Sequence, residues 1–83
     1  MLATICKIYG VNFKLKYQRT HTEKGELFKG MIFLKNPVCF SFVKRKGAPV
    51  SFITECGDHY RENAIVKAIE EAEQRLMTAS SEQ

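Results

Sequence analysis

The chain has 83 residues, of which 45% are hydrophobic and 27% are charged, and its formal net charge is +4. This length suits one domain with a modest core, and the composition is that of a folded protein rather than a disordered one. No uncharged apolar stretch approaches the ~18 residues of a membrane helix, and Lys7 comes too early for a signal-peptide core. We therefore expect a cytoplasmic protein with no membrane partner, in which the three cysteines are reduced thiols.

The charge is distributed unevenly along the chain. Residues 1–50 hold ten Lys or Arg against two acids, a balance of +8, and residues 51–83 hold three against seven, a balance of −4. The two balances sum to the net charge of +4. We therefore expect an electrically polarised molecule with a basic first half.

Strand patterns begin near the start of the chain. Residues 4–9 are β-branched and aromatic enough for a short strand. Residues 11–18 alternate between apolar and polar, which is the period of a half-buried strand. Gly10 is either a bulge inside one long strand or the turn between two short ones. The polar segment 19–26, which includes Gly25, is expected to be a hairpin loop.

Further strands follow this loop. Residues 26–35 are apolar on both faces, which is typical of a central strand, and Pro37 ends it because proline cannot donate to the ladder. Residues 38–45 and 50–56 have the composition of two more strands, joined by a turn. The sequence thus predicts an antiparallel meander.

The period of the pattern changes after Gly57. Apolar residues then recur at helical spacing over residues 59–77, in a stripe made of Ile65, Ala68 or Ile69, Ala72 and Leu76. Asp58 is expected to cap the helix, because its carboxylate can accept an orphan backbone N–H. If Leu76 packs in the core, Leu76→Asp destabilises the protein by several kcal/mol.

These patterns predict an α+β fold over residues 1–78, a meander of three or four strands followed by one C-terminal helix packed on one face, with residues 79–83 as a frayed tail. The covered face is expected to hold Phe28, Ile32, Leu34, Phe40, Phe42, Val50 and Phe52. The opposite face is expected to hold Lys29, Met31, Phe33, Cys39, Ser41, Val43, Arg45, Ser51 and Ile53. This order of elements is similar, in topology alone, to several small DNA-binding folds, including the amino-terminal arm-binding domains of phage integrases.

Basic residues of the first half are candidates for binding phosphate groups, because cations release condensed counterions from nucleic acid. They are Lys14, Lys16, Lys29, Lys44, Arg45 and Lys46. Small sheets bind duplexes with strand side chains in a groove and hairpin tips on the backbone. We therefore predict a nucleic-acid-binding protein, with duplex DNA favoured. In the alternatives, the lysines only keep the sheet soluble, or the cations bind an acidic protein partner.

Apolar residues on the uncovered face suggest a second function. The candidates are Met31, Phe33, Val43 and Ile53, which would form an exposed patch typical of an interface. Such a patch would suit a protein-interaction module, for instance an inhibitor or adaptor docking on a larger partner, and the chain's size suits a phage or mobile-element accessory protein. It would equally suit a homodimer with two sheets packed face to face.

Residues with metal-binding or catalytic chemistry form weaker patterns. Cys56 and His59 have ligand-like spacing, which Cys6 and Cys39 would extend to a set of four, but Cys39 lies in a strand where small buried thiols are common. Cys56, Asp58 and His59 also resemble a nucleophile with its base, yet such catalysis needs a cleft that excludes water. We therefore expect no metal, no cofactor and no enzymatic activity.

Overall fold

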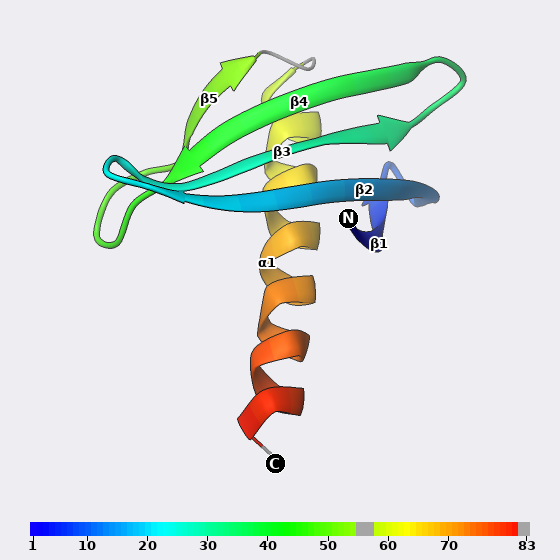
Figure 1. Ribbon diagram of the computed structural model, residues 1–83. Coiled ribbons are helices and arrows are strands. Elements are labelled where there is room, and N and C mark those ends of the chain that lie inside the picture. Colours follow the sequence, from blue (N-terminus) through cyan, green and yellow to red (C-terminus); the bar gives the residue numbers. More distant parts are fainter. Residues whose placement is uncertain (55–57, 82–83) are drawn as a thin grey trace.

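A computed structural model describes residues 1–54 and 58–81 (Figure 1). In these ranges the elements are β1 (Leu2–Ile8), β2 (Val11–Thr22), β3 (Gly25–Phe33), β4 (Pro37–Lys44), β5 (Ser51–Thr54) and α1 (His59–Ser81). The strands form one antiparallel sheet in the order β1-β2-β3-β4-β5. The predicted α+β meander with a C-terminal helix is confirmed, with a slightly higher strand count than predicted.

The turn at Tyr9 and Gly10 accounts for the additional strand. Both residues have positive φ, 49° and 78°, and Ile8 pairs with Val11 on either side of them. Positive φ at both central positions defines a type I′ turn, whose twist matches that of a two-stranded hairpin. Of the two alternatives for Gly10, the structure therefore has the turn.

The predicted hairpin at residues 19–26 is present, but its loop is shorter than predicted. β2 continues to Thr22 and β3 begins at Gly25, which leaves a turn of two residues. The polar residues stay in the ladder because they pair across it, as His21 Nδ1 and Glu26 Oε1 do at 2.9 Å. A polar stretch thus extends the strand where cross-strand partners hold it.

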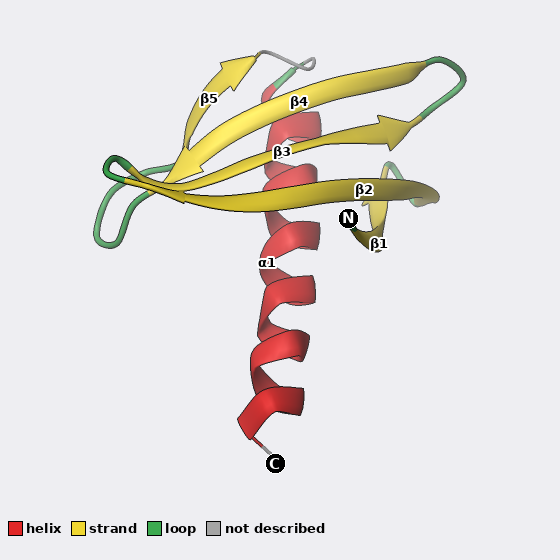
Figure 2. Ribbon diagram, in the orientation of Figure 1, coloured by secondary structure: helices red, strands yellow, loops and turns green. Residues whose placement is uncertain are grey.

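The hydrophobic core lies between one face of the sheet and α1, which crosses behind the strands in the view of Figures 1 and 2. Its buried strand residues are Cys6, Ile8, Leu15, Tyr17, Phe28, Ile32, Phe40 and Phe42, and its buried helix residues are Ile65, Ala68, Ile69 and Ala72. Leu34, Val50 and Phe52 pack against them. The helix therefore covers the face that the sequence predicted.

Gly30 allows close packing at the centre of the covered face. A Cβ atom at this position would lie 2.1 Å from the Lys16 carbonyl oxygen and 2.9 Å from Cζ of Phe40. The strand partners of Gly30 are Tyr17 and Phe40, both of which are buried. A glycine is needed here because the backbone of β2 and the Phe40 ring already occupy the space of a side chain.

The sequence predicted the start of α1 better than its end. Asp58 caps the first turn as expected, since its Oδ1 accepts a hydrogen bond from the Arg61 backbone N–H at 2.8 Å. The helix runs to Ser81 and extends well past the sheet (Figure 1). Leu76 is therefore 47% exposed, so its predicted place in the core was wrong. Residues 82–83 of the expected tail lie outside the described residues.

Truncating two apolar residues of α1 tests where its packing ends. Ile69 is buried, so we expect Ile69→Ala to lower the free energy of unfolding by about 2–5 kcal/mol through lost burial and the cavity left behind. Leu76 lies past the sheet, so we expect Leu76→Ala to cost about 1 kcal/mol or less. Urea denaturation of both variants measures the difference. Equal losses would mean that Leu76 is packed as tightly as Ile69.

Candidate nucleic-acid interface

Three lysines lie next to one another on the side of the sheet that α1 does not cover, which we call the open face. Its central strand residues are Lys14, Lys16, Gln18, Leu27, Lys29, Met31, Phe33, Cys39, Ser41 and Val43. Lys14 and Lys16 are two residues apart on β2, about 7 Å along the strand. Lys16 pairs with Met31, which places Lys29 on the diagonal, also about 7–8 Å away.

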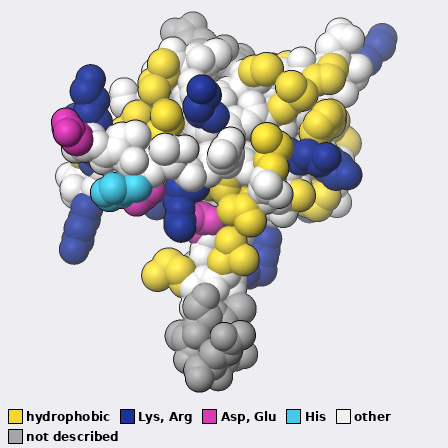
Figure 3. Space-filling view, in the orientation of Figure 1, with side chains coloured by type: hydrophobic (Ala, Val, Ile, Leu, Met, Phe, Trp, Pro, Cys, Tyr) yellow, Lys and Arg dark blue, Asp and Glu magenta, His cyan; other side chains and the backbone are white. Residues whose placement is uncertain are grey.

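No acidic side chain offsets these lysines on their own face. None of the described strand residues that point to this face is Asp or Glu, and Lys14, Lys16 and Lys29 have no ion pair in the described part of the chain. Figure 3 shows basic and hydrophobic side chains interspersed over the strands, and acidic ones only at one hairpin end and beside the helix. The open face is therefore positively charged.

Two of these lysines, Lys16 and Lys29, border an open hollow that contains Phe33. The hollow has a volume of about 710 Å³. It is lined by Met1, Lys16, Gln18, Thr20, Leu27, Lys29, Gly30, Met31 and Phe33. Lys16 Nζ lies 6.0 Å from the centre of the Phe33 ring, a cation–π distance, and the ring is 37% exposed. The surface thus has an apolar floor with cations around it.

The three cations of the β4–β5 loop do not join this group as one unit. Lys44 faces the helix, and its Nζ lies 3.7 Å from Oε1 of Glu70. Lys46 lines a groove with Glu70 and Glu73 on the same side. The Arg45 side chain passes the tip of the β2–β3 hairpin, where a Cβ atom on Gly25 would lie 2.6 Å from its Cγ. Lys44 and Lys46 thus lie on the helix side, and Arg45 between them lies at the hairpin tip.

The apolar candidates are divided in a similar way. Met31 and Phe33 lie on the open face beside Lys16, and Val43 lies on it farther along, paired with Leu27. Ile53 is 64% exposed and is the extra residue of a bulge where β5 pairs with β4. Met31 and Phe33 therefore form the apolar part of the site.

A partly buried polar network on the covered face was not predicted from the sequence. The Tyr17 hydroxyl donates a hydrogen bond to Oε2 of Glu73 at 2.8 Å, and Arg19 pairs with Oε1 of the same carboxylate. The Glu73 side chain is only 13% exposed. Burial and the hydrogen bond to Glu73 raise the pKa of Tyr17 above its usual range. Helix acids thus neutralise cations of the covered face and leave those of the open face unpaired.

The candidate metal ligands lie apart. Cys6 is buried on the covered face, whereas Cys39 is exposed on the open face, and Cys56 lies outside the described residues. His59 Nδ1 lies 3.6 Å from Oε1 of Glu62. Among the described residues no three or more His, Cys, Asp or Glu side chains are grouped closely enough to hold a metal ion.

No protein-family model, curated protein or solved structure matches this chain. In the ranges that the structure describes, no helix combines the length and apolarity needed to cross a membrane. The function is therefore inferred from the geometry of the site alone.

The pH dependence of stability tests the network around Tyr17. Its folded pKa exceeds the unfolded value of about 10, so its contribution is complete below pH ~10 and is lost as the pH rises through the folded pKa. We expect the free energy of unfolding to fall above pH ~10, more steeply in the parent than in Tyr17→Phe by up to about 1.4 kcal/mol per pH unit. Urea denaturation across this range measures both slopes, and parallel slopes would contradict the network.

Proposed function

We propose that this protein binds nucleic acid, with duplex DNA preferred, through the open face of its sheet. The observation that carries the proposal is the cluster of Lys14, Lys16 and Lys29 on a face without acids, while α1 supplies acids to cations on the other face. Unpaired lysines release counterions when they meet phosphates, and this release favours binding at low salt. Lysines already paired with a carboxylate gain less from the same contact.

The spacing of the lysines suits a polymer of phosphates better than one small anion. Lys16 lies about 7 Å from Lys14 along β2 and about 7–8 Å from Lys29 across the strands, so each can contact a different phosphate group. The hollow between them is open rather than enclosed, which suits an extended ligand lying on the sheet. Gln18 and Thr20 line the same hollow and carry the donors and acceptors that contact base edges.

The aromatic content of the open face favours a duplex over a single strand. Sequence-tolerant binding of single strands relies on several aromatic rings on which successive bases stack. Phe33 is the one aromatic side chain among the described strand residues that point to this face. Small sheets bind duplexes with strand side chains in a groove of the nucleic acid and with basic side chains on the adjacent phosphate backbone, and the open face offers side chains of both kinds.

The β4–β5 loop has a secondary part in this proposal. Lys44 is paired with Glu70, but both side chains are nearly half exposed, and surface pairs of this kind contribute only about 0–1 kcal/mol. A phosphate at the rim of the sheet can therefore compete with Glu70 for Lys44. Arg45, at the tip of the neighbouring β2–β3 hairpin, would add a contact at the same rim.

A protein partner is the second candidate, and a specific observation favours it. Leu27, Met31 and Val43 leave part of their apolar surface open, and Phe33 is exposed beside them. Such a patch suits docking on a larger protein or on the sheet of a second copy. Binding through it would depend little on salt, whereas phosphate binding weakens steeply as salt rises.

A salt series on a triple variant tests the proposed function. In this variant the three open-face lysines Lys14, Lys16 and Lys29 are replaced by glutamine. If each lysine contacts one phosphate, the slope of log K against log salt on duplex DNA flattens by up to ~2.7. Fluorescence anisotropy with a labelled duplex at several salt concentrations measures the slope.

A matched variant controls for net charge. It changes three exposed lysines elsewhere to glutamine, at Lys24, Lys35 and Lys67. We expect its salt slope to stay close to that of the parent, because its net charge equals that of the first variant but the open face is intact. Equal slopes for both variants would remove the open face as the binding site, and parent binding that is insensitive to salt would favour the protein partner.

A further inference from the structure

β1 has a free edge whose backbone groups face outward. Ile8 and Val11 flank the two-residue turn, and in such hairpins this pair exchanges both of its hydrogen bonds. Hydrogen-bonded pairs alternate along an antiparallel ladder, so every second residue of β1 points its N–H and C=O away from β2. These residues are Ala3, Ile5 and Lys7, and all three are exposed. The edge is thus a template for another strand.

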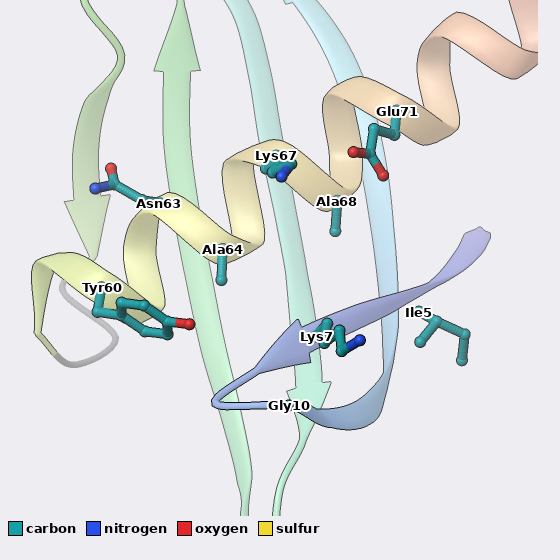
Figure 4. A pocket seen from close by; sticks show the side chains of 9 residues that line it. All are labelled: Ile5, Lys7, Gly10, Tyr60, Asn63, Ala64, Lys67, Ala68 and Glu71. Atoms are coloured by element: carbon teal, nitrogen blue, oxygen red, sulfur yellow. The ribbon is translucent and has the colours of Figure 1, made fainter.

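A groove runs along this edge, between β1 and α1 (Figure 4). Its volume is about 640 Å³, and Ile5 and Lys7 line it from the strand side. Ala64 and Ala68 point from the helix toward β1, and their small side chains leave space between the two elements. Arg75 donates a hydrogen bond to Oγ1 of Thr4 at 3.1 Å, which ties the helix to the strand. The groove therefore has two fixed walls.

The charges along the groove are mainly positive. Lys7 lines it from the strand and Lys67 from the helix, and within the described residues neither has an ion pair. Glu71 is the one acid that lines it. A segment with a carboxylate side chain would therefore complement the groove. A second copy of this chain would instead place its own Lys7 and Lys67 beside these two, which like-charge repulsion disfavours.

We propose that an extended segment of a partner protein, carrying at least one Asp or Glu, adds to the free edge of β1 and lies in the groove against α1. Main-chain hydrogen bonds to Ala3, Ile5 and Lys7 supply affinity, as in other cases of strand addition, and the side chains of the groove supply selectivity. The groove borders the open face, because Ile5 pairs with Lys14 and Lys7 with Asn12. Peptide binding is measured without nucleic acid, so this proposal stands or falls independently of the proposed nucleic-acid binding.

A phage-displayed library of random peptides of about 10 residues, the length of a long strand, is the probe. Selection against the full chain is expected to enrich peptides with β-branched residues and at least one acid. Ile5→Pro removes an outward N–H and leaves the bonds to β2 in place, so it should weaken the selected peptides by at least about fivefold. Ile5→Thr keeps that N–H and is the matched control, with affinity within about twofold of the parent.

Charge reversals test the second part of the proposal. Lys7→Glu and Lys67→Glu should each weaken the selected peptides, whereas Lys35→Glu, away from the groove, should leave their affinity unchanged. Peptides without acids, or binding that ignores the first two reversals, would overturn the assignment of an acidic segment.

Strand addition itself would be overturned if the library yields no binder, or if the selected peptides bind the Ile5→Pro variant as tightly as the parent. It would also be overturned if sedimentation shows that the parent is a dimer and that Ile5→Pro dissociates it. The last would assign the edge to a second copy. Should Ile5→Pro fail to fold, amide hydrogen exchange on the parent decides. A bound peptide should slow the exchange of Ala3, Ile5 and Lys7, and unchanged exchange contradicts the proposal.

Discussion

The packing of α1 on one face of the sheet is the constraint on which the other features of this protein depend. Ile65 and Ile69 are buried against the strands, and Glu73 completes the contact through Tyr17 and Arg19. This contact sorts the alternating residues of every strand into a covered set and an open set. It also brings helix carboxylates to Arg19 and Lys44 on the covered face, while Lys14, Lys16 and Lys29 on the open face have no ion pair among the described residues.

The same helix creates the second surface of interest. Because α1 lies alongside β1, the free edge of this strand borders a groove rather than open solvent. The open face and the groove differ in chemistry: one presents unpaired lysines around an apolar hollow, and the other presents backbone donors and acceptors beside two lysines. The two surfaces adjoin each other at β1 and β2, where Ile5 pairs with Lys14 and Lys7 with Asn12.

Much of the fold could be predicted because the sequence changes period where the structure changes type. The alternation of residues 11–18 and the helical stripe near Ile65 each reflect burial on one side only. The loop predicted at residues 19–26 was too long, because polarity alone does not separate a loop from a strand with polar cross-strand partners. The prediction that Leu76 lies in the core was wrong because helical periodicity continues past the end of the sheet on which the helix packs.

The site was predictable to a smaller extent, for a related reason. Alternation placed Lys14 and Lys16 on one side of β2 and Lys29 on the uncovered side of the next strand, and the register shows that the three are neighbours. The surroundings of the three cations at residues 44–46 could not be read from the sequence, because consecutive residues point in different directions. The contact between Tyr17 and Glu73 joins residues 56 positions apart, and no local pattern encodes it.

Chemical-shift mapping by NMR with a short duplex DNA tests the central claim most directly. Titration into the labelled protein should shift the amides of β2 and β3 around Lys14, Lys16 and Lys29, and the shifts should shrink as salt is added. The amides of α1 that face away from the sheet should stay in place. Shifts confined to the helix or to the groove beside β1, or no shift at low salt, would contradict nucleic-acid binding through the open face.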